Sequence, residues 1–268
     1  MKDDLGDRMK SFYEDRTRFY LCRKTNHILR IDGKAFHSYT KGLNRPFDED
    51  FIADMNETAR FLCSEIQGAK IGYVQSDEIS IWFNDENSIN TDLWFNGNIQ
   101  KVVSVSASIA TCKFNTLRSI RGVDKPAYFD ARVFTIPSLE EVVNYFIWRQ
   151  NDAVRNSICA VAQSLYSHKE LHGKNQNDQQ ELIFQKGLNW NDFPTRQKRG
   201  SAIRRINGKW VVDDDTPIFT SDRDYIRKVE LMDLKSLIEE GEKNRKEFEK
   251  QSIGTRIITE EDLKFRCR

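Results

Sequence analysis

The sequence predicts an α+β fold, an antiparallel sheet with its helices on one face. Strand-like and helix-like stretches alternate in the order β-α-β-β-α-β, which is the ferredoxin-like, or split βαβ, arrangement. A short polar tetrad separates the two central strand candidates, as in a hairpin. Hydrophobic residues make up 38% of the 268 residues. That is enough apolar material for one or two packed domains and too much for a disordered chain.

The chain starts with a charged stretch, residues 5–24, whose apolar positions recur at helical spacing. This spacing predicts an amphipathic surface helix. Its apolar positions are Leu5, Met9, Phe12, Tyr13, Phe19 and Tyr20. Residues 28–31 follow as a short strand, which Asp32 and Gly33 end.

A second helix is predicted over residues 49–67. Asp48 is a plausible N-cap residue, and Phe47 could pack on Ile52 as a hydrophobic staple. Gly68 then provides a C-terminal stop. The apolar stripe of this helix consists of Phe51, Ile52, Met55, Ala59, Leu62 and Ile66.

The strands 71–74 and 79–83 form the predicted hairpin, with Gln75, Ser76, Asp77 and Glu78 at its tip. A helix is predicted over residues 88–112, although its β-branched residues weaken the helical pattern. Residues 132–136 form the last strand of the core.

Ser138 and Glu141 have capping-box spacing, and they open a helical stretch that continues to about residue 166. Beyond residue 167 the pattern loosens, and residues 185–205 mix aromatic and basic side chains. This segment could follow a nucleic-acid backbone or be a solvated loop. Its aromatic and basic members are Trp190, Phe193, Arg196, Lys198, Arg199, Arg204 and Arg205. Residues 210–212 suggest a strand, and residues 232–250 a polar helix on the surface or facing a partner.

Charge, targeting signals and cysteines exclude several classes of protein. Lys and Arg number 42 against 41 Asp and Glu, so the net charge of +1 gives no overall attraction to nucleic acid. No apolar run approaches the roughly 20 residues of a membrane span, and the charged N-terminus does not resemble a signal peptide. The five cysteines are widely spaced, without a CxxC pair. We therefore expect a soluble cytoplasmic protein with structural thiols.

Carboxylates occur at the ends of two predicted strands. Asp32 ends the first strand, and Asp77 and Glu78 lie at the hairpin tip. In a βαββαβ sheet the first and third strands can be neighbours, which would bring Asp32 next to Asp77. Two carboxylates suit Mg²⁺, which takes phosphate oxygens as further ligands, and two such ions clamp the phosphate in nucleotidyl transfer. Alternatively, these are ordinary turn residues.

Other motifs are weaker. Gly33 could let backbone N–H groups approach a phosphate, but the segment is not a P-loop and could be a plain turn. His168 and His172 fail the HExxH pattern and are expected on the surface. With four histidines in the chain, nucleophilic hydrolase chemistry has few possible bases. Arg149 and Asp152 are either a surface ion pair or a holder of substrate phosphates.

Six motifs, in order over roughly residues 6–200, resemble one family: tRNA(His) guanylyltransferase and its relatives, the guanylyltransferase-like 3′–5′ polymerases. The motifs are Gly6-Asp7-Arg8-Met9-Lys10 with Tyr13-Glu14, Arg30-Ile31-Asp32-Gly33-Lys34-Ala35-Phe36-His37, Arg45-Pro46-Phe47-Asp48, Gln75-Ser76-Asp77-Glu78-Ile79-Ser80, Phe129-Asp130-Ala131-Arg132 and Trp148-Arg149-Gln150.

The resemblance implies a palm domain like that of polymerases and nucleotide cyclases. It implies a catalytic core over residues 1–136, including an N-terminal helix. An α-rich extension over residues 137–268 would serve tRNA binding and oligomerisation. Two Mg²⁺ ions would be held by Asp32, the Gly33 carbonyl and Asp77, with Glu78 as the adjacent catalytic acid. The nucleoside triphosphate would contact Gly33, Lys34, Ala35, Phe36, His37, Arg45, Asp48 and Ser76.

The implied reaction uses ATP to adenylylate a tRNA 5′-monophosphate. The 3′-hydroxyl of an incoming GTP or other NTP then displaces AMP. The family is typically tetrameric, so a homotetramer, a dimer of dimers, is expected. The expected tRNA contacts are Arg30, Arg132, Arg149, Arg155, Asn156, Lys198 and Arg199.

One segment departs from the eukaryotic tRNA(His) enzymes. They carry His-Ile-Asn-Asn-Leu-Tyr-Asn after the Trp-Arg-Gln motif, whereas residues 154–160 here read Val-Arg-Asn-Ser-Ile-Cys-Ala. The chain in this respect resembles the bacterial and archaeal-type branch, which repairs tRNA 5′ ends opposite a template. The alternatives are a true tRNA(His) guanylyltransferase, a nucleotide cyclase-like enzyme and a non-catalytic RNA-binding module.

Overall fold

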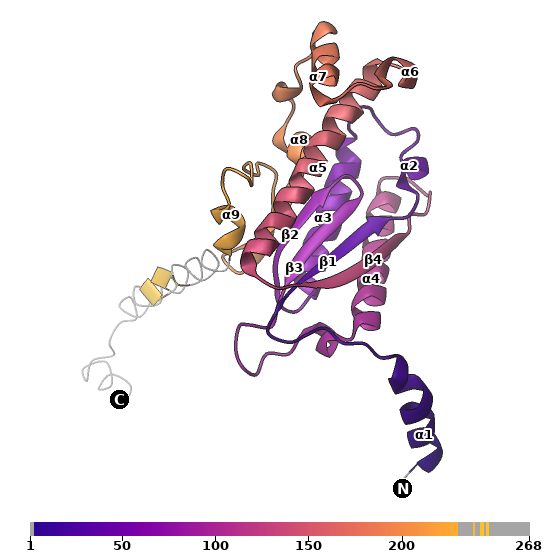
Figure 1. The fold of residues 1–268 in the computed structure, drawn as a ribbon, viewed down its shortest axis with the longest axis vertical. Coiled ribbons are helices and arrows are strands. Elements are labelled where there is room, and N and C mark those ends of the chain that lie inside the picture. Colours follow the sequence, from indigo (N-terminus) through magenta and orange to yellow (C-terminus); the bar gives the residue numbers. More distant parts are fainter. Residues whose placement is uncertain (1–2, 230–237, 239–241, 244, 247–268) are drawn as a thin grey trace, which may run out of the picture.

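The computed structural model describes residues 3–229, 238, 242, 243, 245 and 246. In this part of the chain six strands form one antiparallel sheet in the order β4-β1-β3-β2-β5-β6 (Figure 1). The strands are β1 (Asn26–Gly33), β2 (Ala69–Gln75), β3 (Glu78–Phe83), β4 (Phe129–Ile136), β5 (Ser201–Ile206) and β6 (Lys209–Asp213). The first four follow the predicted βαββαβ order. Strands β5 and β6 extend the same sheet from β2, so the sheet takes strands from both sides of residue 136.

Helices cover both faces of the sheet (Figure 1). The main helices are α3 (Glu49–Glu65), α4 (Ile99–Ile120) and α5 (Leu139–Leu165). Shorter helices are α1 (Asp4–Met9), α2 (Phe36–Tyr39), α6 (His168–Leu171), α7 (Gln176–Gln185), α8 (Thr195–Arg199) and α9 (Asp224–Arg227). The two core helices, α3 and α4, share one face as predicted, and α5 covers the other. No helix of the described residues is long and apolar enough to cross a membrane.

Alternation along the strands explains the two-sided core. In β1, Leu29 and Ile31 join the cluster under α3 and α4, whereas Ile28 joins the cluster under α5. Successive strand residues point to opposite faces, so a sheet covered on both sides needs apolar residues at successive positions. Every residue of β3 is buried for this reason.

The predicted start of helix α3, at Glu49 after the cap Asp48, is confirmed. The Asp48 carboxylate accepts a hydrogen bond from the backbone N–H of Phe51 at 2.8 Å and caps the helix. The side chain of Phe47, expected on Ile52, makes an edge-to-face contact with Phe193. The Ser138 hydroxyl likewise caps α5 by accepting from the Glu141 N–H at 3.3 Å. The Glu141 carboxylate accepts from Asn144, so the predicted capping box is half formed.

Two predicted helix boundaries are wrong. The N-terminal helix ends early, because α1 continues only through a π-helical turn (Lys10–Glu14) and a 3₁₀ turn (Asp15–Thr17). The predicted helix over 88–112 begins eleven residues later, at Ile99, after a 3₁₀ turn (Trp94–Gly97). Asn98 caps it by accepting from the Lys101 N–H at 3.0 Å. The sequence Asn96-Gly97-Asn98 forms a turn, and this local turn preference prevails over the apolar spacing of the preceding residues.

The C-terminal predictions have mixed outcomes. The strand over 210–212 is confirmed as β6, and the basic segment contributes α8 and most of β5, after a 3₁₀ turn (Trp190–Asp192). The helix predicted over 232–250 falls mostly outside the described residues. Four cysteines, Cys22, Cys63, Cys112 and Cys159, are free thiols. Cys267 lies outside the described residues.

A buried ion pair joins the helices α3 and α4. Arg118 Nη1 lies 3.1 Å from Asp54 Oδ2, and both side chains are at most 3% exposed. Arg121 Nε approaches the other oxygen of Asp54 at 2.9 Å. Two arginines of α4 therefore converge on one carboxylate of α3 and fix how the two helices cross.

We expect Asp54→Ala to destabilise the protein by about 3–5 kcal/mol, because it leaves the Arg118 guanidinium buried without its anion. Chemical denaturation measures this loss. The matched control is Asp50→Ala, which removes an exposed partner of Arg121 and is expected to cost less than about 1 kcal/mol. Equal losses from both substitutions would contradict a specific role for the buried pair.

Candidate functional site

The pairing of β1 with β3 brings the predicted acids together. Asp32 lies opposite Glu78 in the antiparallel register. The backbone N–H of Gly33 donates to the carbonyl of Asp77 at 3.1 Å. The prediction that the first and third strands are neighbours is confirmed. Asp32 and Asp77, 45 positions apart in the sequence, thus lie at one end of the sheet.

A tight turn holds Asp77. Ser76 and Asp77 link β2 to β3, and Ser76 adopts a left-handed backbone conformation with φ of 50°. Burial, reinforced by the negative charges of Asp32 and Glu78, raises the pKa of Asp77 to about 6. An ionised Asp77 is therefore costly in the protein alone, and a bound cation would relieve that cost.

The donor set suits a hard cation. The Asp32 carboxylate is only one-third exposed, and its cationic neighbours are Arg132 Nη2 at 3.8 Å and Arg30 Nη2 at 4.0 Å. These distances exceed normal hydrogen bonds. Within the described residues no group of three or more His, Cys, Asp or Glu side chains gathers as a metal site. The predicted ligands are the carboxylates of Asp32 and Asp77 and the carbonyl of Gly33. Such oxygen ligands fit Mg²⁺, which keeps waters and binds substrate phosphates.

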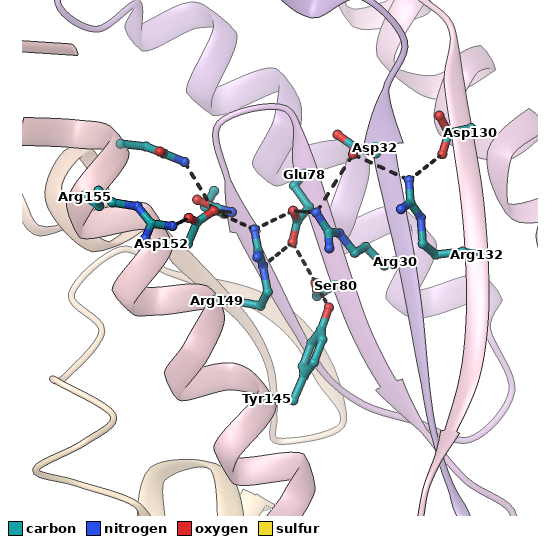
Figure 2. Close-up of polar contacts among 12 residues, drawn as sticks. Arg30, Asp32, Glu78, Ser80, Asp130, Arg132, Tyr145, Arg149, Asp152 and Arg155 are labelled. Atoms are coloured by element: carbon teal, nitrogen blue, oxygen red, sulfur yellow. Dashed lines mark hydrogen bonds and ion pairs between the residues drawn. The ribbon is translucent and has the colours of Figure 1, made fainter. Parts of the chain in front are cut away.

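Glu78 is already occupied by arginines (Figure 2). Arg149 forms two 2.7 Å hydrogen bonds with it, one to each carboxylate oxygen. Arg30 Nη2 lies 2.6 Å from Glu78 Oε2. Burial raises the pKa of Glu78, and the two guanidinium groups oppose that shift. Of the three predicted catalytic acids, Glu78 is therefore the one that arginines hold by hydrogen bonds, whereas Asp32 makes only longer ion pairs with Arg30 and Arg132.

The network extends along α5 (Figure 2). Arg149 Nη2 donates to Asp152 Oδ2 at 2.9 Å, and Asp152 also accepts from Arg155 and Asn156. The side chain of Arg149 is 4% exposed, while that of Arg155 is 60% exposed. Of these predicted tRNA contacts, Arg155 and Asn156 are accessible. The burial of Arg149 assigns it to holding Glu78 in this conformation.

The segment after β1 turns sharply above an aromatic core. Ala35 has φ of 57°, and the Lys34 N–H donates to the Tyr128 carbonyl at 2.8 Å. The ring of Phe36 is buried and would lie 2.2 Å from a Cβ atom at position 33. Gly33 is therefore required for this packing, independently of any phosphate. Among the predicted nucleotide contacts, Phe36 can offer only its backbone.

A cavity of about 290 Å³ opens beside the Asp77 turn. It contains four predicted nucleotide contacts, His37, Arg45, Asp48 and Ser76. Both Asp48 oxygens accept backbone N–H groups, from Phe51 and Asn44, so Asp48 shapes the wall as a helix cap. Polar lining residues that sequence reasoning missed are Thr40, Lys41, Asn44, Ser157, Gln163, Ser164 and Gln197. No local motif marks them, because they come from separate elements.

The basic segment contributes less free charge than its sequence suggests. The Lys198 ammonium donates to the Asn191 carbonyl and lies 5.7 Å from the Trp190 ring centroid. Arg199 donates to the Thr216 carbonyl at 3.3 Å. Both predicted tRNA contacts are thus engaged within the fold, and Arg196 is the basic side chain of this segment that lines the cavity.

Comparisons with known proteins agree with this geometry. The family model for tRNAHis guanylyltransferase, Thg1, matches residues 6–137. A bacterial tRNA(His) guanylyltransferase (Thg1)-like protein in complex with ATP aligns with a TM-score of 0.80 at 46% identity, over 84% of this chain and 99% of that chain. The chain belongs to the Thg1 family. It is therefore a nucleotidyltransferase with the palm-like fold of that family, which rejects the non-catalytic alternative.

Two further relatives place the chain within the Thg1 family. A bacterial Thg1-like protein in complex with GTP aligns with a TM-score of 0.73 at 43% identity, over 85% of this chain and 99% of that chain. The tRNA(His) guanylyltransferase of Saccharomyces cerevisiae is 28% identical over 199 residues, covering 66% of this chain and 81% of the yeast protein.

We expect Asp77→Asn to stabilise the metal-free protein at pH 8, by roughly 3 kcal/mol, and to change its stability little at about pH 3.5. The Asp77 pKa of about 6 exceeds its usual 3.8. The stability that the neutral carboxyl contributes is complete below the lower value and is lost as pH rises through about 6. Urea denaturation at both pH values, in a chelating buffer, measures the difference. A gain in the free energy of unfolding that does not depend on pH would contradict this explanation.

Proposed function

We propose that the chain is a template-dependent 3′–5′ nucleotidyltransferase that adds nucleotides to the 5′ end of tRNA. The observation that carries this proposal is the pair Asp32 and Asp77, brought together next to the turn whose Ser76 lines a polar cavity, in a Thg1-family enzyme. The substrates are tRNA, ATP and a second nucleoside triphosphate such as GTP. The ATP and GTP complexes of the bacterial Thg1-like proteins support the choice of nucleotides.

The cavity fits the triphosphate end of a nucleotide. Its lining carries Lys41, Arg45 and Arg196, together with His37 and the Ser76 hydroxyl. These cationic and hydroxyl groups suit phosphate oxygens. The acids beside the Ser76 turn would hold Mg²⁺, with Asp32, Asp77 and the Gly33 carbonyl as ligands. The bound metal would polarise the phosphoryl oxygens and neutralise developing charge.

The protein's own groups contribute positioning. In the first step a tRNA 5′-phosphate oxygen attacks the α-phosphorus of ATP and pyrophosphate leaves. In the second, the 3′-hydroxyl of the incoming nucleotide attacks the activated 5′-phosphorus and AMP leaves. Both steps are in-line displacements, in which alignment and charge neutralisation supply most of the catalysis. Asp32 and Asp77 would hold the Mg²⁺ to which the reacting phosphate binds, while Glu78 and Arg149 keep the turn and α5 in place.

Residues 154–160 favour repair over obligatory G addition. Asn156, Ser157 and Ala160 of this stretch line the cavity, where eukaryotic tRNA(His) enzymes carry a different motif. The alternative is a tRNA(His) guanylyltransferase that adds G at position −1. A homotetramer, expected from the resemblance, remains part of the proposal.

We expect the added nucleotide to follow the opposing base of the tRNA. The assay uses a tRNA lacking its 5′-terminal nucleotide, labelled as the 5′-monophosphate, with ATP, Mg²⁺ and each NTP. Four substrates differ only in the base opposite the missing position. Extension by the complementary nucleotide in each case supports repair, and addition of G whatever lies opposite supports the tRNA(His) alternative. Product formation from nucleotides alone would favour a cyclase-like activity.

We expect Asp32→Asn to reduce Mg²⁺-dependent extension by at least about 10³-fold, because it removes a charged metal ligand. Single-turnover extension measures the rate, and a gel-shift assay is expected to show nearly unchanged tRNA binding. Asp130→Asn is the matched control, since Asp130 faces Asp32 across the β1–β4 pair but is 61% exposed. Activity of the Asp32 variant comparable to that of the control would remove our metal assignment.

A further inference from the structure

Trp148 is exposed next to the acids, although α5 otherwise packs its aromatic residues into the core. Its side chain is 53% exposed, whereas Tyr145 and Phe146 on the same helix are buried. A single exposed aromatic residue needs no explanation by itself. The position of Trp148 beside the acids does need an explanation.

One guanidinium group connects Trp148 to the site. The Cζ atom of Arg30 lies 5.9 Å from the centroid of the Trp148 ring. The same guanidinium lies 2.6 Å from Glu78 Oε2 and 4.0 Å from Asp32 Oδ2. The indole therefore borders the acids. It is not among the residues that line the nucleotide cavity.

The indole is held rigidly from behind. The guanidinium of Arg149 stacks 4.4 Å from its ring centroid, and the two hydrogen bonds to Glu78 fix that guanidinium. The ring of Tyr145 makes an edge contact with the indole at 5.8 Å. The hydroxyl of Tyr145 is itself bonded to Ser80 at 2.8 Å. An aromatic group fixed in this way can receive a planar ligand at low entropic cost.

The acids thus have two different neighbourhoods. The cavity adjoins the turn that carries Asp77, and the outer part of β1 and β4 adjoins Asp32. Figure 2 shows Arg30, Arg132 and Asp130 together on this second side, on the sheet face beside α5. Arg132 lies opposite Arg30 in the β1–β4 register and is 54% exposed. A nucleotidyl transfer needs a second reactant that reaches the phosphorus in line with the leaving group, and this second side is open to one.

We propose that Trp148 is the stacking platform for the terminal base at the 5′ end of the RNA substrate, with Arg132, opposite Arg30 on the neighbouring strand, for a backbone phosphate. This inference rests on the proposed function and specifies how the RNA is positioned. Single-stranded and terminal bases are recognised by stacking on aromatic rings and on arginine. Because every base has a stacking face, such a platform tolerates any sequence, as repair of different tRNAs requires.

The test compares Trp148→Leu, Trp148→Phe and the wild type. Stacking of one base is lost in the first variant and kept in the second. We expect Trp148→Leu to raise the KM for RNA by about tenfold or more and to leave the KM for the nucleotide unchanged. We expect Trp148→Phe to remain within about threefold of the wild type. Phe184→Leu is the control, because Phe184 on α7 is also an exposed aromatic residue, at 66%.

A binding measurement separates this inference from the proposed function. RNA with 2-aminopurine at its 5′ end loses fluorescence when that base stacks, whether or not extension occurs. We expect the wild type and Trp148→Phe to quench it and Trp148→Leu not to. Equal quenching by all three proteins would overturn the platform, even if the wild type extends tRNA. Quenching by a wild type that extends no RNA would support the platform while rejecting the proposed function.

Two other results would also overturn the platform. If Trp148→Leu lowers kcat and the melting temperature without changing the KM for RNA, the indole serves only to hold Arg149. If Trp148→Leu changes the sedimentation coefficient and Trp148→Phe restores it, the indole is covered by a second copy of the chain.

Discussion

The paired hydrogen bonds between Glu78 and Arg149 are the interaction on which the rest of the site depends. Glu78 is the first residue of β3, directly after the turn that presents Asp77. Arg149 lies in the middle of α5, which supplies one wall of the polar cavity. Both side chains are buried, and removing one partner of such a pair typically costs about 3–5 kcal/mol. The pair therefore fixes α5 against the hairpin, and so fixes the cavity wall relative to the acids.

The same charges that serve the chemistry work against the fold. Asp32 and Asp77 repel each other, and burial makes the ionised Asp77 costly, as its raised pKa shows. Glu78 adds a third negative charge, but Arg30 and Arg149 compensate it. The protein thus binds one of the three acids to its own arginines by close hydrogen bonds, while the arginine nitrogens nearest Asp32 stay 3.8–4.0 Å away. This division separates the supporting acid from the proposed metal ligands.

Sequence patterns predicted the order of the core elements because each has local signals. The Asp48 cap, the apolar stripe of α3 and the hairpin tip are all read within a few residues. The β1–β3 neighbour relation followed from the order alone, and it placed Asp32 beside Asp77. The start of α4 was missed because a short turn signal competed with a longer apolar pattern. The burial of Arg149 was also missed, since its partner Glu78 is 71 residues away.

The cations around the site indicate how it can bind RNA with a net charge of only +1. Several basic side chains around the site already have partners: Arg149 holds Glu78, Arg196 holds Glu49, and Lys198 lies on Trp190. The pairs of Arg132 with Asp130 and Arg155 with Asp152 leave their arginines more than half exposed. Surface pairs of this kind contribute little stability, so a phosphate can replace the carboxylate at small cost. Base stacking then supplies the affinity for RNA that other proteins obtain from a uniformly positive surface. Stacking depends less on salt than phosphate contacts do.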